Sequence, residues 1–288
     1  MRRPIVNSVS GVDLLVIGGG GLLGREIIRQ ARASGAQVVA TFHHRPRPVA
    51  GVDWRPLDIR IRDDVGDLVR QTRPTAIMNA AFKKDDWATT ANGAAHVALA
   101  AARDGVRLVH VSSDAVFSGA AERYDEHSVP DPVTPYGAAK AAAETAVAAI
   151  HPAAVVARTS LIIGDGDSPH EAHVHAVARG TTTDVLFTDE VRCPIHVADL
   201  ASALVELAGS PQTGIQHLAG TDAVSRYELG MLIAHRDGLD EAELPRGLRA
   251  ETRHPGALDV RLDCTETRSR LTTRLRGAFE FLGSASCP

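Results

Sequence analysis

A run of glycines near the start of the chain constrains the fold more than any other feature. Gly18 to Gly21 and Gly24 lie between an apolar run at 12–17 and an amphipathic stretch at 22–33. This order is typical of a dinucleotide-binding unit, because glycine allows a tight turn and leaves the backbone open to a pyrophosphate at the helix N-terminus. The spacing fits GxGxxG (Gly19, Gly21, Gly24) and GxxGxxG (Gly18, Gly21, Gly24). We therefore predict a nucleotide site here, with Leu22 and Leu23 beginning the helix; the alternative is a purely structural turn.

Short apolar runs alternate with amphipathic stretches through the first 158 residues. We predict strands at 12–17, 37–42, 54–57, 76–79, 107–111 and 155–158, and helices at 22–33, 62–71, 88–103 and 135–150. This alternation favours an α/β fold, a doubly wound parallel sheet of Rossmann type with helices on both faces. After residue 158 the rhythm loosens, with helices expected near 171–178 and 197–207 and a strand at 215–218.

We expect two interleaved domains. Residues 1–158 plus about 196–220 are predicted to form the dinucleotide-binding domain. Residues from about 159 to 195 plus 221–288 are predicted to form a smaller substrate-binding domain.

Composition excludes several classes of protein. The net charge of −4 and pI near 6.3 favour neither nucleic acid nor an anionic membrane as a partner. No apolar stretch is long enough to cross a bilayer, and the Arg2–Arg3 start runs into polar residues too early for a signal peptide. The cysteines (Cys193, Cys264 and Cys287) are odd in number and widely spaced. They fit neither a disulfide framework nor a metal site, so we expect a reducing, cytoplasmic location.

The end of the second predicted strand indicates which dinucleotide is bound. An acidic residue there would bind the ribose hydroxyls of NAD, but the segment is Thr41-Phe42-His43-His44-Arg45. Arg45, with His43 or His44, would pair with a 2′-phosphate. We predict NADP(H), with NAD(H) as the alternative; the segment would otherwise be a solvated basic loop.

Three polar residues suggest proton transfer to a carbonyl oxygen. Ser113 follows the fifth predicted strand, and Tyr136 and Lys140 lie four apart on a predicted helix, on one face. A nearby ammonium is expected to lower the pKa of the phenol, which would protonate the oxygen while Ser113 holds it. The Tyr-x3-Lys spacing also occurs by chance. However, the chain has only three lysines against 28 arginines, so lysine is an unusual basic residue for this chain to have at position 140.

Taken together, these motifs resemble the extended short-chain dehydrogenase/reductase superfamily, in its dTDP-4-dehydrorhamnose reductase-like branch that modifies sugar nucleotides. The likeness extends over about residues 12–220. It includes the glycine turn, Asn79-Ala80-Ala81, Ser112-Ser113-Asp114, Tyr136 to Lys140, Arg158-Thr159-Ser160 and 193–201.

The resemblance implies roles for individual residues. Gly18, Gly21 and Gly24 would cradle the pyrophosphate, Asp58 and Ile59 would flank the adenine, and Ala80 and Ala81 would line the nicotinamide ribose. Lys140 would also hold ribose hydroxyls, and Asn92 would relay protons. The residues expected on the substrate side are Phe82, Lys83, Ser113, Asp114, Leu161 and Arg192, with 194–200 bordering the pocket.

The sequence departs from the family pattern at residues that are expected near the sugar of the substrate. Ala115 stands where these reductases usually have an aromatic residue, and Leu161 where they often have tryptophan. We therefore expect NADPH-dependent reduction of a keto group, most simply on a dTDP-type 4-keto deoxysugar, without fixing the sugar. The alternatives are a sugar-nucleotide epimerase or dehydratase, and a non-catalytic NADP-binding regulatory or sensor protein. The alanine-rich helix leaves a homodimer open.

Other patterns do not support a site. The histidines at 170, 173 and 175 lack a metal-ligand spacing, and we expect a polar flap helix there. There is no Gly-x-Ser-x-Gly elbow and no P-loop lysine. We therefore predict no metal site, no hydrolase and no P-loop nucleotide site.

Overall fold

The computed structural model describes residues 13–46, 49–253 and 256–283. The predicted strand start at Val12, the chain start and Cys287 lie outside these ranges. The chain divides into two compact units, each built from several segments. Unit 1 comprises the residues up to Ser112 with Ala138–Ala157 and Ala201–Gln216; unit 2 comprises Ser113–Gly137, Arg158–Leu200 and the residues from His217 onward. Three segments predicted for the dinucleotide-binding domain thus cluster with unit 2, namely 113–137, 196–200 and 217–220. The binding role of each domain stays a prediction.

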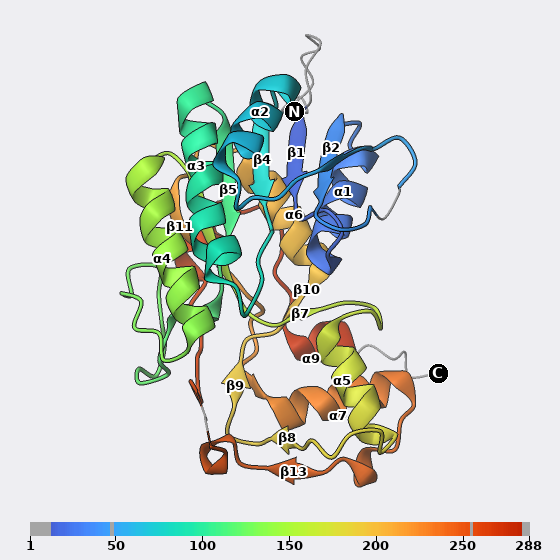
Figure 1. The fold of residues 1–288 in the computed structure, drawn as a ribbon. Coiled ribbons are helices and arrows are strands. Elements are labelled where there is room, and N and C mark those ends of the chain that lie inside the picture. The colour runs from blue at the N-terminus through green and yellow to red at the C-terminus, as the bar shows by residue number, and fades with distance from the viewer. Residues whose placement is uncertain (1–12, 47–48, 254–255, 284–288) are drawn as a thin grey trace. The chain divides into compact units, whose positions relative to one another are not determined.

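Unit 1 is built on a seven-stranded sheet with the order β11-β6-β5-β4-β1-β2-β3. The pairings β1–β2, β1–β4, β2–β3, β4–β5 and β5–β6 are all parallel. This confirms the predicted doubly wound α/β class (Figure 1). The strands are β1 (Leu14–Ile17), β2 (Val38–Phe42), β3 (Asp53–Pro56), β4 (Ala76–Asn79), β5 (Arg107–Val111), β6 (Val155–Thr159) and β11 (Gly214–Leu218).

The helices begin close to their predicted positions because their apolar spacing is regular. In α1 (Leu22–Ala33), Leu23, Ile27, Ile28 and Ala31 are buried on one face. The predicted helix 88–103 is divided into a π-helical turn (Ala88–Asn92) and α3 (Gly93–Asp104). The remaining helices that pass through unit 1 are α2 (Arg62–Thr72), α4 (Pro135–Ile150) and α6 (Val197–Ala208).

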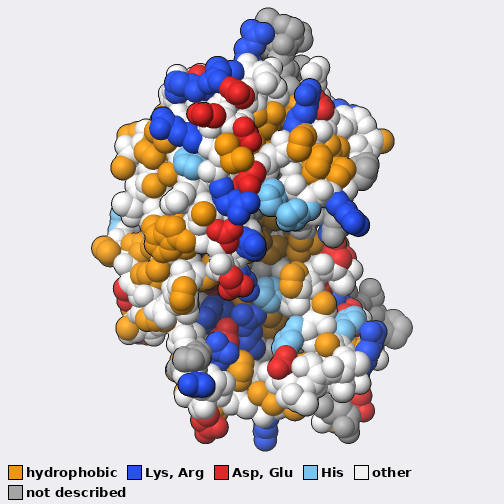
Figure 2. Space-filling view, viewed as in Figure 1, with side chains coloured by type: hydrophobic (Ala, Val, Ile, Leu, Met, Phe, Trp, Pro, Cys, Tyr) orange, Lys and Arg blue, Asp and Glu red, His pale blue; other side chains and the backbone are white. Residues whose placement is uncertain are grey.

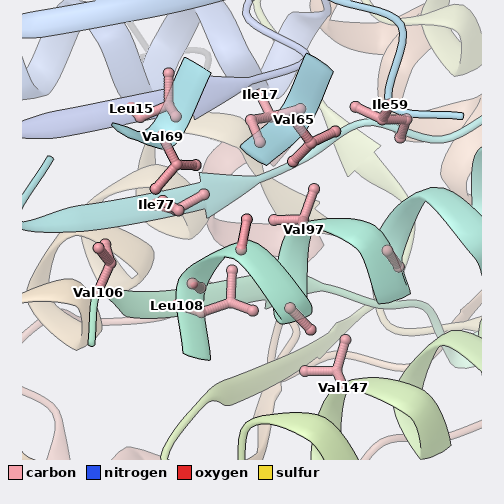
Figure 3. Close-up of a cluster of buried hydrophobic side chains, with 14 of the residues drawn as sticks. Leu15, Ile17, Ile59, Val65, Val69, Ile77, Val97, Val106, Leu108 and Val147 are labelled. Carbon is pink, nitrogen blue, oxygen red and sulfur yellow. The ribbon is translucent and has the colours of Figure 1, made fainter. Parts of the chain in front are cut away.

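The main core of unit 1 lies between the sheet and helices α2, α3 and α4. Figure 3 shows Ile77 and Leu108 of the strands among Val69, Val97 and Val147 of the three helices. Helices α1 and α6 lie on the other face, where Ser202 donates to Gln30 Oε1 at 2.7 Å (Figure 1). The sheet is therefore covered on both faces, so a ligand must bind at the strand ends.

Unit 2 has its own core around α5 (Pro169–Ala178), α7 (Arg226–Asp237) and α9 (Ala278–Gly283). The helix predicted at 170–175 is confirmed, but its description as a polar flap is wrong: Val174 and Val177 of α5 belong to this core, and Glu171 is fully buried in a capping box with Ser168. The other elements are short. They are β7 (Ile162–Ile163), β8 (Leu186–Phe187), β9 (Val191–Arg192), β10 (Ile195–His196), β12 (Val224–Ser225), β13 (Arg246–Gly247), α8 (Thr265–Arg270), and 3₁₀ turns at Asp114–Val116, Glu241–Glu243 and Arg249–Glu251.

The surface carries charges of both signs. Figure 2 shows acidic and basic side chains interspersed over the viewed face, together with groups of hydrophobic side chains. Across the described ranges, every helix is too short or too polar to span a bilayer.

Candidate active site

A pocket of about 670 Å³ lies in unit 1, where strands β1 to β4 end. The strand order reverses here, since β2 and β4 flank β1 on opposite sides. Ligands of open α/β sheets bind outside the strand ends at such a switch point. The lining residues are Ile17, Gly18, Gly20, Gly21, Thr41, Phe42, His43, His44, Arg45, Leu57, Asp58, Ile59, Arg60, Ala80, Ala81, Phe82, Lys83, Asp86 and Thr89.

Three glycines of the turn are required by the protein's own packing, and a Cβ at Gly19 would lie 2.9 Å from the Cβ of Ala40. Gly18 has a φ of +86°, and a Cβ there would lie 2.8 Å from the backbone nitrogen of Ala81. A Cβ at Gly24 would lie 2.3 Å from the carbonyl oxygen of Gly18. The Gly18 N–H also donates to Thr41 Oγ1 at 3.2 Å, so β2 holds the turn in place. Gly18, Gly19 and Gly24 therefore shape the turn.

Gly20 and Gly21 have no such packing requirement. A Cβ at Gly20 would meet nothing within 4 Å, and one at Gly21 would meet the Gly18 oxygen at an ordinary 3.6 Å. Neither residue has a left-handed φ, and both line the pocket. Bare backbone at these two positions fits a ligand that approaches the main chain closely.

The N-terminus of α1 follows directly and fits an anion. Gly21 is its N-cap without a side-chain cap, and the first turn contains no acidic residue. Free N–H groups and the positive end of the helix dipole favour a negative charge there. The cradle therefore fits the pyrophosphate of a dinucleotide. The predicted residues Leu22, Leu23 and Gly24 lie at the start of α1. They support the cradle but do not line the pocket.

The end of β2 brings the predicted basic segment to the pocket. His43, His44 and Arg45 are exposed and line it. The His43 Nε2 atom lies 3.4 Å from Asp58 Oδ2, and the rings of His43 and His44 have centroids 4.0 Å apart. Arg45 is thus placed where the chain can meet a 2′-phosphate, which fits NADP.

The residues after β3 and β4 complete the lining. Both Asp58 oxygens accept hydrogen bonds from Arg60, at 2.9 and 2.6 Å, which holds the pKa of Asp58 well below its usual range. Ile59 lines the pocket from the core. The residues directly after β4 also line the pocket, namely Ala80, Ala81, Phe82 and Lys83. The Phe82 side chain is 51% exposed. These predicted residues therefore share one cavity.

Lys140 of α4 is buried in unit 1. Its Nζ atom donates to the carbonyl oxygen of Val111 at 2.6 Å and lies 5.7 Å from the centroid of the Phe82 ring. Burial lowers the pKa of Lys140 to about 8, and the Glu144 carboxylate opposes that shift. The pKa of Lys140 therefore lies closer to neutral pH than that of an ordinary lysine.

Ser113 and Tyr136 meet within unit 2. The Ser113 hydroxyl hydrogen-bonds the phenol of Tyr136, and Ser113 Oγ lies 3.2 Å from Asp114 Oδ1. The predicted lowering of the Tyr136 pKa is wrong. Burial and the Asp114 charge raise it to about 12, with the Ser113 hydrogen bond opposing them. The phenol is therefore protonated at neutral pH, as an acid that delivers a proton must be.

Asp114 lies beside this pair and contacts two residues that the sequence analysis named for other reasons, Ser160 and Arg192. It is 5% exposed and accepts a hydrogen bond from Ser160 Oγ at 2.6 Å. The Arg192 Nε atom lies 3.7 Å from Asp114 Oδ2, while the rest of the guanidinium donates to the carbonyl oxygens of Val191, Leu258 and Ala257. A substrate role for Asp114 and Arg192 stays a prediction.

Two other predicted residues, Leu161 and Asn92, do not line the pocket of unit 1. Leu161 is 8% exposed in the core of unit 2. Asn92 is exposed at the end of the π-helical turn. Their predicted roles in substrate contact and proton relay remain predictions.

Sequence reasoning missed several pocket residues. Gly20 belongs to neither of the two glycine spacings. Thr41 and Arg60 line the pocket, but no motif predicted them as site residues. The position of Thr41 at the end of a predicted strand was the one signal that could have identified it. Within the described ranges, no three His, Cys, Asp or Glu side chains come together as a metal-binding group.

Comparisons with known proteins agree with this geometry. The family model described as "RmlD substrate binding domain" matches residues 12–274. The dTDP-4-dehydrorhamnose reductase of Mycolicibacterium smegmatis is 31% identical over 256 residues, covering 84% of this chain and 74% of that protein. The crystal structure of a hypothetical dTDP-4-dehydrorhamnose reductase from Sulfolobus tokodaii is 27% identical with a TM-score of 0.79, covering 92% of this chain and 96% of that one. Methionine adenosyltransferase 2 subunit beta of Xenopus tropicalis is 28% identical, covering 82% of this chain and 75% of that protein.

Proposed function

Because this chain belongs to the RmlD substrate binding domain family, a branch of the extended short-chain dehydrogenases/reductases, we propose that it is an NADPH-dependent reductase of a keto group on a nucleotide-activated deoxysugar. The observation that carries the proposal is the hydrogen bond between Ser113 and a protonated Tyr136. A regulatory protein would not need this pair, whereas a carbonyl reductase needs an oxygen-holding hydroxyl beside an acid.

The dinucleotide is held by the pocket of unit 1 in this proposal. Gly18, Gly20 and Gly21 with the start of α1 receive the pyrophosphate, and Arg45 receives the 2′-phosphate that distinguishes NADP from NAD. When bound, the reduced dinucleotide supplies the hydride for the carbonyl carbon. Lys140 binds ribose hydroxyls with its ammonium.

The proton chemistry belongs to the chain itself. The Ser113 hydroxyl donates a hydrogen bond to the carbonyl oxygen, which orients it and stabilises the charge that develops there. Tyr136 then transfers its phenolic proton to that oxygen and becomes a phenolate.

The substrate is a nucleotide sugar carrying a keto group, as the name of the mycobacterial relative describes for that enzyme. Ala115 and Leu161 depart from the pattern of the rhamnose-type reductases, and Leu161 is packed into the core. We therefore propose a dTDP-type 4-keto deoxysugar as the class, with a sugar other than 4-dehydrorhamnose accepted. A cytoplasmic location and a homodimer remain parts of the same proposal.

A second function is favoured by one observation. The methionine adenosyltransferase subunit is a relative whose printed name is that of a subunit rather than a reductase. This chain would then bind NADP without turnover. Measuring NADPH consumption in the presence of keto sugars distinguishes the two functions.

The test is NADPH oxidation with a panel of dTDP-, UDP- and GDP-linked 4-keto sugars, followed at 340 nm with product analysis. Reduction of at least one member by the parent protein, lost in Tyr136→Phe while NADPH binding is kept, is the expected result. Tight NADPH binding with no oxidation by any sugar would favour the regulatory function. A parental rate in Tyr136→Phe would show that another group is the acid.

A further inference from the structure

Helix α4 carries two charged residues among sixteen, and both are buried. Lys140 and Glu144 lie one helical turn apart in a run that is otherwise mostly alanine. Lys140 is 2% exposed and Glu144 is 4% exposed. Two charged side chains on the buried side of an apolar helix are costly unless they compensate one another.

The end of β5 holds both side chains through consecutive residues. The Val111 carbonyl accepts the hydrogen bond from Lys140 Nζ at 2.6 Å, and Ser112 Oγ donates to Glu144 Oε1 at 2.5 Å. Ser112 is itself 2% exposed. The carboxylate is therefore held in the interior, one helical turn from the lysine.

Other groups that face Lys140 do not supply a negative charge. His110 of β5 is buried, with Nδ1 on the Asn79 amide at 3.1 Å, and burial and the Lys140 charge both push its pKa well below its usual value, so it stays neutral. Phe82 offers only its ring face. Burial lowers the pKa of Lys140, and Glu144 is the group that raises it.

We propose that Glu144 is a positioning residue for Lys140: its carboxylate, fixed by the Ser112 hydroxyl, supplies the negative charge that keeps the buried ammonium protonated. The catalytic consequence rests on the proposed function, because Lys140 donates its full set of three hydrogen-bond protons toward ribose hydroxyls only as an ammonium. The charge relationship itself holds whether or not the protein turns over a substrate.

The chain offers a direct measurement because it contains only three lysines, of which Lys83 and Lys84 are exposed. Lysine labelled with ¹³C and ¹⁵N gives three side-chain signals, and Lys140→Met identifies the buried one. We expect the Lys140 signal to titrate about one to three pH units lower in Glu144→Gln than in the parent. Lys83 and Lys84 serve as internal references.

Matched variants separate charge from packing. Glu144→Asp keeps the charge and should restore most of the parental midpoint, whereas Asp67→Asn removes an exposed carboxylate from α2 and should leave it unchanged. Should Glu144→Gln fail to fold by circular dichroism, Ser112→Ala takes its place. Loss of the anchoring hydroxyl should move the midpoint in the same direction by less. An unchanged Lys140 midpoint in the folded variants overturns the inference.

The pH profile of kcat is a second readout. If Lys140 acts as proposed, the alkaline limb of the profile moves to lower pH in Glu144→Gln together with the NMR midpoint. A moved midpoint with an unmoved limb supports the charge relationship and contradicts the catalytic role of Lys140. If no keto sugar is reduced, the NMR titration still decides for or against Glu144.

Discussion

The ammonium of Lys140 donates its hydrogen bond to the Val111 carbonyl at the end of β5, 2.6 Å away. This contact ties the middle of α4 to the end of β5, the strand that Ser112 and Ser113 follow. A free amine would donate a weaker hydrogen bond, so the protonation state of Lys140 bears on the strength of this contact.

Replacing Lys140 by methionine should change how stability depends on pH. The folded pKa is about 8, below the ordinary 10.5, so between these pH values the unfolded state binds more protons and the Lys140 contribution to stability rises with pH. Relative to Lys140→Met, the parent should gain up to about 3 kcal/mol from pH 8 to 10.5. Urea denaturation of both proteins across this range measures the difference. A constant difference would contradict the lowered pKa.

Two single substitutions in the glycine turn should separate folding from binding. In Gly24→Ala the new Cβ would press on the Gly18 carbonyl, so we expect a loss of about 1–3 kcal/mol or more in the free energy of unfolding. In Gly21→Ala the loss should be smaller, about 0.5–1 kcal/mol, because the nearest atom is 3.6 Å away and only the poorer N-cap propensity of alanine counts. NADPH affinity should nevertheless fall at least about tenfold, since the methyl group occupies the cradle. Thermal unfolding and calorimetric titration measure the two effects; parental NADPH affinity in Gly21→Ala would remove the cradle from the cofactor site.

Arg45→Ala should reduce the preference for NADPH over NADH. The side chain lines the pocket at the end of β2, and loss of a charge-assisted contact to phosphate costs about 1.5–3 kcal/mol, or roughly 10- to 100-fold in affinity. NADH affinity should be unchanged. Fluorescence titration with both dinucleotides tests this, with Arg73→Ala at the end of α2 as an exposed control. An equal loss for NADPH and NADH would place Arg45 away from the 2′-phosphate.

Ser113→Ala should lower kcat by about 10²- to 10³-fold, because the oxygen of the substrate loses its hydrogen bond and Tyr136 loses the bond that lowers its pKa. The Kd for NADPH should stay at the parental value. Ser128→Ala is a matched control in the same unit, with its hydroxyl on the exposed Asp125. Steady-state kinetics and NADPH titration give both numbers, and parental turnover in Ser113→Ala would refute its role.

The local pattern of apolar and turn residues was sufficient to predict most of the fold. The strands Ala76–Asn79 and Arg107–Val111 and the helices Leu22–Ala33 and Pro135–Ile150 follow from apolar spacing and flanking turn residues, which act over a few positions of the chain. The glycine turn likewise predicted where the pocket of unit 1 lies, because glycines before a helix N-terminus leave the backbone open to an anion.

Tertiary structure alone decided how the charged and polar groups are arranged. Ser112 meets Glu144 across 32 residues, Asp114 meets Ser160 across 46, and Thr41 meets Gly18 across 23. The pKa of Tyr136, raised where the spacing to Lys140 favours a lowered value, depends on burial and on Asp114. Burial and long-range charge are set by which strand ends the sheet brings together, and no local pattern in the sequence records that.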